Sequence, residues 1–491
     1  MPPPLQGRLR HIPISRGYVL IDTPLINPKT KPHIGPIIPL CRSELVIKAT
    51  PDMRDPVTSN SPDQCLDETR VFLMLQGPHG PYFWQLGKML RAAGATVWRV
   101  GFNAGDRAFW FSTKTFLPYT DTPEAWPDTF QSIVADKGVT DIVLYGDPRP
   151  VHALAVARAK ELGLRIHVFE EGYLRPFWIT YERDGANGHS ALMGLSVEQM
   201  RTALANIDHD NIEAPDHWGD MRQHIFYGAL YHWFVMFRNG AFKHFRGHRE
   251  LPVTYEFMLY FKRLIMMPLH RASRRWRTWR IRRSGHPFHI ALLQLEHDAS
   301  FQVHSHYSTM PEFISDVIDG FAKGAPRHHH LVFKAHPLES DRRNLLAEVK
   351  RLAANFGVTG RVHFVRGGKL ASLLNYARSA VTVNSTAGQQ ALARGLPLRT
   401  FGTAVFAKPE FVSHQSLDAF FMHPERPDTR AYKDYRQFLL ETSQVPGGFY
   451  SARGRRQLLR LVVDMMLAQH GPYDALINGN AHPRPSLRPT R

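Results

Sequence analysis

Short apolar runs that alternate with helix-like segments are the feature of this 491-residue sequence that most limits its fold. The run VFLML begins at Val71, and after a turn the segment YFWQLGKMLRAAG has apolar positions at helical spacing. Further apolar runs lie at residues 96–102, 141–146 and 165–172, the last preceded by the helix-like VHALAVARAKELG. Strands and helices that alternate at this spacing form a parallel sheet with right-handed crossovers. We therefore expect a Rossmann-like domain over residues 69–200.

The same alternation returns after residue 286. Apolar runs that read as strands lie at residues 289–297, 329–337, 361–367, 380–385 and 396–402. Between them lie helix-like segments such as RRNLLAEVKRLAANFG and AGQQALARG, which end at Gly357 and Gly395. We expect a second Rossmann-like domain over residues 287–415, suited to binding a nucleotide. The fold class is thus α/β, with two Rossmann-like domains facing a cleft, as in several enzyme classes that include the GT-B glycosyltransferases.

The remaining segments differ in composition. Residues 1–68 are rich in Pro and lack periodicity, so we expect a poorly ordered extension. Residues 416–477 contain the amphipathic GRRQLLRLVVDMMLAQHG and are expected to be helical, whereas residues 478–491 lack core-forming residues and are expected to be a disordered tail. Residues 201–286 form a basic, aromatic segment between the two domains, which we expect to be helical.

The positive charge of the chain is concentrated in that basic segment. The chain has 61 Lys and Arg against 43 Asp and Glu, a formal charge of +18. Residues 222–283 hold fourteen of these cations and two acids, interleaved with Trp, Phe and Tyr. Such interleaving suits a helix in the interface of an anionic bilayer. Nucleic acid and a packed aromatic core with solvated arginines are the alternatives; the absence of any nucleic-acid-binding motif disfavours nucleic acid as a partner.

Several other classes of protein are disfavoured. Only Cys41 and Cys65 occur, which predicts no disulfide framework. The longest apolar stretch, residues 226–237, is too short to span a bilayer, and the N-terminus lacks the apolar core of a signal peptide. The sequence Asp208-His209-Asp210 follows no apolar strand, and residues 328–330, all His, lack a ligand partner at metal spacing. We expect both at the surface, and no metal site.

Polar residues follow the predicted strands, where parallel sheets bind ligands. They include Gln76, Asp106, Gln294 and Asp298. Gly77 and Gly80 would allow the backbone to approach an anion or form an ordinary strand-to-helix turn. Glu170 and Glu171 end a strand together, and since neighbouring side chains on a strand point to opposite faces, we expect separate roles for the two. One would serve as nucleophile or acid/base in the cleft, and the other would anchor the structure.

Two strand ends of the second domain carry groups that bind phosphate. Lys334 and His336 follow one strand and suit a phosphate or the leaving group of a nucleotide sugar. Ser385 and Thr386 follow another, where a hydroxyl serves either as a helix N-cap or as a phosphate ligand. Both roles remain open for Ser385.

Together, these blocks resemble a known family. The blocks are VFLMLQGPHGPYFWQLGKMLRAAGATVWRVGFNAGDRAFW, VFEEGYLRPFWITYERDGANGHS, LLQLEHDAS, FKAHP and VNSTAGQQALARGLP, in that order. The resemblance covers about residues 70–410 and is to the bacterial capsule polysaccharide biosynthesis proteins of the KpsS type, which are retaining β-Kdo glycosyltransferases.

The resemblance implies transfer of β-Kdo from CMP-Kdo to lysophosphatidylglycerol, a step that starts the lipid linker of a capsule. The nucleophile of the family's E-D-G-F block corresponds to Glu171, in the sequence Glu170-Glu171-Gly172-Tyr173. Arg175, or another arginine of the cleft, would hold the Kdo carboxylate. The residues assigned to the donor nucleotide are Lys334, His336, Ser385, Thr386 and Gln294, and those assigned to substrate orientation are Gln76, Gly77, Asp106, Glu170, Arg175 and Asp298. By analogy, the reaction needs no metal and no cofactor.

The resemblance also implies a location and partners. The protein is expected at the cytoplasmic face of the inner membrane, as a peripheral protein in contact with an anionic acceptor lipid and with other capsule biosynthesis and export proteins. Two alternatives remain. The donor could be another CMP-sugar, such as CMP-sialic acid, or the chain could be a non-catalytic factor in capsule assembly.

Overall fold

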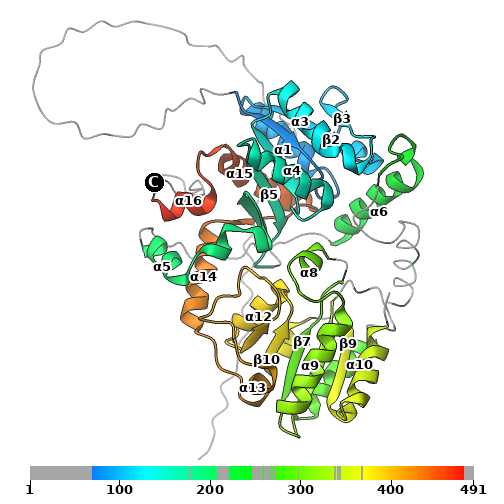
Figure 1. Ribbon diagram of the computed structural model, residues 1–491, viewed down its shortest axis with the longest axis vertical. Coiled ribbons are helices and arrows are strands. Elements are labelled where there is room, and N and C mark those ends of the chain that lie inside the picture. Colours follow the sequence, from blue (N-terminus) through cyan, green and yellow to red (C-terminus); the bar gives the residue numbers. More distant parts are fainter. Residues whose placement is uncertain are drawn as a thin grey trace, which may run out of the picture. The chain divides into compact units, whose positions relative to one another are not determined.

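The computed structural model describes 69–175, 178–205, 207, 221–245, 258, 266, 269, 272–296, 298–336, 339, 344–366 and 369–479. The proposed extension over residues 1–68, nearly all of the proposed tail over 478–491, and Asp208-His209-Asp210 lie outside these residues. Two sheets with flanking helices make up the described part (Figure 1). The expected α/β class, with two Rossmann-like sheets, is confirmed by their strand orders.

The first sheet has seven strands in the order β12-β6-β5-β4-β1-β2-β3. Its neighbours from β5 to β3 pair in parallel, whereas β6 pairs antiparallel with both β5 and β12 at the other edge. The strands are β1 (Val71–Met74), β2 (Thr96–Gly101), β3 (Phe116–Pro118), β4 (Asp141–Tyr145), β5 (Arg165–Glu171), β6 (Trp178–Arg183) and β12 (Gln444–Pro446). The helices among β1 to β5 are α1 (Tyr82–Ala92), α2 (Ala104–Ala108), α3 (Trp126–Lys137) and α4 (Pro150–Glu161).

The second sheet has five strands, all parallel, in the order β11-β10-β7-β8-β9. The strands are β7 (Phe288–Leu292), β8 (His330–Ala335), β9 (Val362–Arg366), β10 (Ala377–Thr382) and β11 (Leu398–Thr400). The helices of this half are α8 (Ala299–Val303), α9 (Met310–Gly324), α10 (Leu345–Asn355), α11 (Ala371–Leu374), α12 (Gln389–Leu392) and α13 (Leu417–Met422). Gly357 and Gly395 have φ of 69° and 66°, as expected of glycines that end helices.

One expectation for the second sheet was wrong in part. We expected residues 328–330 at the surface, and His328 is exposed, but His329 is only 4% exposed. Its Nδ1 lies 3.1 Å from His289 Nε2, and His330 Nδ1 lies 2.8 Å from His363 Nε2. These imidazoles pair across neighbouring strands near the amino ends of the sheet, a role that a run of histidines in sequence does not reveal.

The C-terminal segment returns to the first sheet. After α14 (Thr429–Glu441), β12 pairs with β6, and α15 (Ala452–Leu467) packs against α1; α16 (Pro472–Ile477) follows. The periodicity of residues 454–471 predicted α15. It did not predict β12, because three residues that include Pro446 carry no period of their own.

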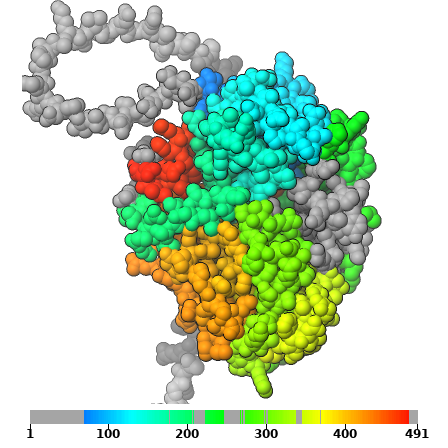
Figure 2. Space-filling view, viewed as in Figure 1, coloured from blue at the N-terminus to red at the C-terminus, as the bar shows by residue number. Residues whose placement is uncertain are grey.

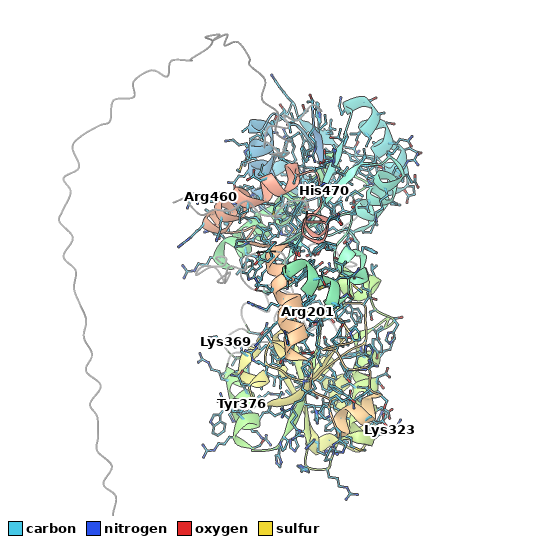
Figure 3. All side chains as sticks on the ribbon, turned by 90° about the vertical axis from the view of Figure 1, so that its left-hand side faces the viewer. Arg201, Lys323, Lys369, Tyr376, Arg460 and His470 are labelled. Carbon is cyan, nitrogen blue, oxygen red and sulfur yellow. The ribbon has the colours of Figure 1, made fainter. Side chains whose placement is uncertain are left out.

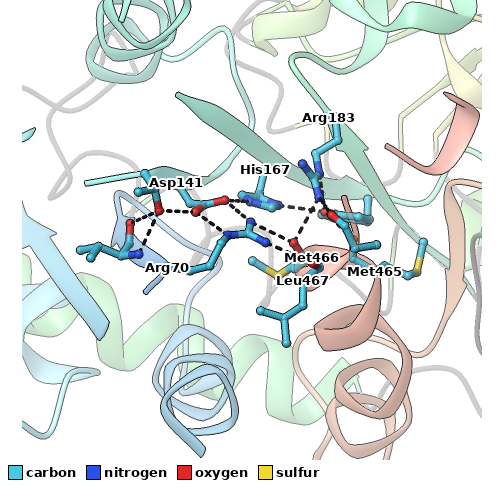
Figure 4. Close-up of polar contacts among 11 residues, drawn as sticks. Arg70, Asp141, His167, Arg183, Met465, Met466 and Leu467 are labelled. Carbon is cyan, nitrogen blue, oxygen red and sulfur yellow. Dashed lines mark hydrogen bonds and ion pairs between the residues drawn. The ribbon is translucent and has the colours of Figure 1, made fainter. Parts of the chain in front are cut away.

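A buried ionic network fastens α15 to the first sheet (Figure 4). Arg70 Nε donates to Asp141 Oδ2 at 2.9 Å, and Asp141 Oδ1 lies 2.8 Å from His167 Nε2. Arg70 and Arg183 also donate to backbone carbonyls of residues 466–468, at the C-terminal end of α15, where positive charge is favourable. The chain therefore closes its first sheet with residues from both of its described ends.

Among the described residues between the two sheets, helical segments include α5 (Val197–Ala205), α6 (Met221–Phe237) and residues 272–283. Arg201 of α5, labelled in Figure 3, pairs with Asp434 of α14 at 2.8 Å. In the segment 272–283, Arg282 donates to Tyr376 Oη at 2.8 Å, on the outer side of the second sheet's half (Figure 3). Within the described residues, no helix has both the length and the apolar character needed to cross a membrane.

Candidate active site

The strand orders define where ligands can bind. In the first sheet, successive connections run in opposite directions from β1 and β4, and in the second they do so from β7 and β10. The loops that follow such strands diverge and leave a crevice at the carboxyl edge of the sheet. Most of the predicted site residues follow these strands or their immediate neighbours.

A cavity of about 500 Å³ lies at the carboxyl edge of the second sheet. The β5–β6 turn of the first sheet, with Tyr173 and Arg175, forms one wall. The opposite wall includes Lys334, His336, Ser385 and Thr386, which the sequence assigned to the donor. Arg394 and Arg436 complete a set of four Lys and Arg side chains, and the lining residues, all within the described chain, include no Asp or Glu. The cavity is therefore suited to an anionic ligand.

Lys334 is the buried cation of this cavity. It is 5% exposed, and its Nζ donates to the backbone carbonyl of Ala335 at 3.2 Å. Burial, followed by repulsion from Arg274, lowers the pKa of Lys334 to about 8. An anion bound next to Lys334 would stabilise its charged form.

The predicted residues Ser385 and Gln294 also have structural roles. Ser385 Oγ accepts the backbone N–H of Ala387 at 3.3 Å, the capping role left open above, while it also lines the cavity. Gln294 is not among the lining residues. Its side chain donates to Asn384 Oδ1 at 2.6 Å and accepts the Asn384 N–H at 2.9 Å, so it joins the ends of β7 and β10 behind the cavity.

Glu171 lies among aromatic side chains at the end of β5. Tyr145 Oη donates to Glu171 Oε1 at 3.4 Å. Burial, followed by the charge of Glu171, raises the pKa of both Tyr145 and Tyr450, and Glu171 also acts electrostatically on His224 of α6. Glu171 is half-buried. The carboxylate thus stands in a small polar site that the first sheet, α6 and the C-terminal segment build together.

Glu170 belongs to a different environment. Its Oε1 accepts the backbone N–H of Glu171 at 3.0 Å. Burial raises the pKa of Glu170 to about 7, and the nearby carboxylates of Asp298 and Glu171 add to this rise, while Arg175 opposes it. Successive side chains of β5 point to opposite faces of the sheet. Glu171 is on the same face as Phe169, which packs with Tyr82 and α15. Glu170 is on the same face as Val168, which packs with α3 and α4. The charged neighbours of Glu170 include Asp298 and Arg175, whereas Glu171 accepts the hydrogen bond from Tyr145.

Gln76, Gly77 and Asp106 form part of the scaffold. Asp106 is 2% exposed and accepts hydrogen bonds from Gln76 Nε2, Arg99 Nη2 and the Phe102 N–H at 3.1–3.2 Å. A Cβ at Gly77 would lie 2.7 Å from the ring of Phe83, so close packing requires glycine there. These residues fix the loops that hold α2 and α6.

The structure adds residues that the sequence did not single out. Arg394 and Arg436 come from α12 and α14, and only tertiary packing brings them to the cavity. His189 Nδ1 lies 2.8 Å from Asp147 Oδ2, at the carboxyl end of β4. The loop that carries His189 includes Asp184 and Asn187 at φ of 67° and 53°, the positive-φ non-glycine residues of the described chain. Asp147 directly follows a predicted strand, and this position is the sequence signal that could have identified it as a site residue.

Sequence comparison shows the family. The family of capsule polysaccharide biosynthesis proteins matches residues 140–450, and this chain belongs to that family. The capsule polysaccharide export protein KpsS of Escherichia coli is 29% identical over 382 residues, 78% of this chain and 97% of that protein. The capsule polysaccharide modification protein LipB of Neisseria meningitidis serogroup B is 29% identical over 406 residues, 81% of this chain and 96% of that protein.

Solved structures of similar proteins are more distant. The β-Kdo 2,7 transferase of Thermosulfurimonas dismutans KpsC is 12% identical, with a TM-score of 0.33, over 75% of this chain and 99% of that one. A glycosyltransferase of Rickettsia africae is 9% identical, with a TM-score of 0.29, over 84% of this chain and 97% of that one.

Proposed function

We propose that this protein is a retaining glycosyltransferase that moves β-Kdo from CMP-Kdo to lysophosphatidylglycerol, or to a similar anionic lipid, at the cytoplasmic face of the inner membrane. The product would start the lipid linker of a capsular polysaccharide, for use by other capsule biosynthesis and export proteins. The observation that carries the proposal is the cationic cavity on the second sheet, which lies next to the β5–β6 turn that follows Glu171. A CMP-sugar with an acidic sugar is doubly anionic and matches that charge.

The first displacement uses residues from the halves of both sheets. In the first displacement, a Glu171 oxygen attacks the anomeric carbon of Kdo, and the bond from that carbon to the phosphate oxygen of CMP breaks. Lys334, His336, Arg394 and Arg436 stabilise the phosphate that leaves, which needs no strong acid. Arg175, which lines the cavity, is assigned to the sugar carboxylate. No metal or cofactor enters these steps.

In the second displacement, the acceptor hydroxyl attacks the same carbon. The bond to Glu171 breaks, the carboxylate is restored, and two inversions give retention. The proton of the hydroxyl passes to a base at the carboxyl edge of the first sheet.

The test uses purified protein, CMP-Kdo and a fluorescent lysophosphatidylglycerol. The wild type is expected to give a product one Kdo unit heavier, with the β configuration. The Glu171→Gln variant is expected to keep its fold and lose at least a thousandfold in rate, whereas the matched Glu161→Gln variant, altered at an exposed helix position, keeps full activity.

Three outcomes would contradict parts of the proposal. Full activity in Glu171→Gln would remove the assignment of the nucleophile. Transfer from CMP-sialic acid in preference to CMP-Kdo would show a different donor. Capsule assembly in cells that survives both Glu171→Gln and His336→Ala would support a non-catalytic assembly role instead.

A further inference from the structure

Helix α6 is apolar on nearly all sides. Its seventeen residues read MRQHIFYGALYHWFVMF and hold one formally charged residue, Arg222. Helices of this composition are normally enclosed by protein or by lipid. Helix α6 lies instead at the rim of the described chain, beside the first sheet's half (Figures 1 and 2). Its two faces therefore need separate explanations.

The inner face of α6 packs on the first sheet's half through aromatic side chains. Tyr231 Oη accepts a hydrogen bond from Asn103 Nδ2 at 2.7 Å, and its ring stacks on His79 with centroids 4.4 Å apart. Arg455 of α15 lies over the ring of Tyr227. Phe234 packs against the core of the first sheet. These contacts fix the rotation of the helix about its axis.

The outer face carries large hydrophobic side chains in solvent. Ile225, Phe226, Trp233 and Phe237 are 63%, 59%, 44% and 63% exposed. Phe226, Trp233 and Phe237 are seven and four residues apart, which places them on one side of the helix, and Ile225 stands next to Phe226. We call these four side chains the outer stripe of α6. A continuous exposed apolar stripe of this kind marks a surface that binds a partner.

The charges around this stripe favour one kind of partner. Residues 221–245 and 272–283 contain no Asp or Glu. Arg222, Arg238 and Lys243 flank the stripe and are exposed, and the helical residues 272–283 add six arginines and the exposed Trp276 and Trp279. A second copy of this chain would bring like charges together. An anionic bilayer would neutralise the cations and bury the stripe.

We propose that the outer stripe of α6 docks this protein on an anionic membrane surface, with the helix parallel to the bilayer plane. The inner-face contacts exclude a spanning orientation, because they hold the same helix against protein along its length. Trp233 and the Phe side chains would lie at the level of the lipid headgroups, with the flanking cations among the phosphates. This docking deepens the proposed function, since it places the Glu171 site next to the lipid phase, but its test needs neither donor nor acceptor.

The orientation follows from the neighbours of His224. This residue lies on the inner face of α6, and its ring contacts Tyr450. The charge of Glu171 acts on its pKa and opposes the lowering caused by burial. One helix thus presents lipid-binding side chains outward and one wall of the Glu171 site inward. A headgroup hydroxyl of a lipid in the membrane would reach this site without leaving the bilayer.

The test is sedimentation of the full chain with vesicles of phosphatidylcholine and phosphatidylglycerol in a 7:3 ratio. We expect binding at low salt, weakening at 0.5 M NaCl, and at least tenfold weaker binding to phosphatidylcholine alone. The variant Phe226→Ser/Trp233→Ser is expected to lose at least tenfold in binding. Leu154→Ser, at a residue 43% exposed on α4, is the matched control and keeps wild-type binding.

Folding and self-association are checked separately. The substituted side chains are exposed, so circular dichroism and the melting temperature of the double variant should match the wild type. Equal vesicle binding by the folded double variant would overturn the proposal. So would a wild-type dimer that becomes a monomer in the variant without loss of vesicle binding, because the stripe would then be a subunit interface. A chain that binds vesicles but transfers no Kdo would contradict only the proposed function.

Discussion

The imidazole of His224 lies against the phenol ring of Tyr450, with ring centroids 3.9 Å apart and planes inclined by 38°. His224 belongs to α6, and Tyr450 follows β12, so the contact joins two segments more than two hundred residues apart in sequence. Both residues interact electrostatically with Glu171. The first sheet therefore supplies the carboxylate, while its surroundings come from segments outside the parallel strands.

The Tyr145→Phe variant tests the hydrogen bond to Glu171. The ring packs against Phe449 and should stay in place, but the hydroxyl that orients the carboxylate is lost. Because the contact is long, at 3.4 Å, we expect a three- to tenfold fall in kcat with an unchanged KM for the donor. Steady-state kinetics measure both. Tyr435→Phe is the matched control, since its buried hydroxyl has no hydrogen-bond partner among the described residues, and it should leave kcat unchanged.

The charge of Lys334 predicts a pH dependence of donor binding. Its pKa of about 8 means that the free protein loses this cation as the pH rises through 8, so KM for CMP-Kdo should increase from pH 7 to pH 9. Lys334→Arg keeps its charge over that range and should remove most of the increase, whereas Lys334→Met should raise KM at least tenfold at pH 7. An identical pH profile in Lys334→Arg and the wild type would rule out this role.

The raised pKa of Glu170 predicts that its substitution increases stability at high pH. Its folded pKa of about 7 lies above the ordinary value of 4.5, so the folded state holds an extra proton between these values. Its contribution to stability therefore falls as the pH rises from 4.5 to 7, and the cost is complete above pH 7. Glu170→Gln should raise the free energy of unfolding by about 1–3 kcal/mol at pH 8 and by little at pH 4. Thermal unfolding at the two pH values decides this, and an equal gain at both would contradict it.

The lowered pKa of Asp141 predicts that its substitution decreases stability. Burial alone would raise its pKa, but hydrogen bonds from Arg70 and His167 outweigh burial and hold the pKa well below the usual range. Asp141→Asn leaves the buried Arg70 without its counter-charge and should cost about 3–5 kcal/mol of stability, measured by denaturant unfolding. Arg70→Met/Asp141→Leu removes both charges and should recover part of this loss. A double variant less stable than Asp141→Asn would argue against charge burial as the cause.

The same network predicts acid sensitivity. Burial, followed by Arg183, lowers the pKa of His167 to about 3, so His167 stays neutral in the fold while the unfolded chain takes up a proton below about 6.5. The resulting loss of stability begins near pH 6.5 and continues as the pH falls toward 3, and the loss from Asp141 follows at still lower pH. His167→Gln should flatten the fall in melting temperature between pH 6.5 and pH 4.

Most of the parallel strands could be predicted because they are continuous apolar runs that are largely buried on both faces. Their ends were predicted too, which located Glu171, Lys334 and Ser385 at carboxyl edges. Arg394 and Arg436 could not be found in this way, because they lie on helices and reach the cavity only through packing. The β3, β6 and β12 strands were missed. Of these, β3 and β12 have only three residues each and pair at a sheet edge.

The sequence alone could not predict which face of α6 packs on protein and which is exposed. Its composition indicated an interfacial helix, but the direction of its faces depended on contacts with residues such as Asn103 and Tyr450. Neither contact leaves a periodic signal in the sequence. Aromatic residues for the protein-packed face and for the exposed face are mixed along the same seventeen positions.

The return of β12 and α15 to the first sheet has a consequence for synthesis of the chain. A ribosome releases residues 71–183 long before residues 444–467 exist, so the earliest domain lacks its edge strand and the helix that covers α1 until translation is almost finished. Until then, the exposed edge of β6 offers unpaired backbone groups to any extended chain nearby. A stop codon near residue 440 would therefore remove the edge strand of the first sheet and the helix that covers α1, although residues 71–183 are synthesised first.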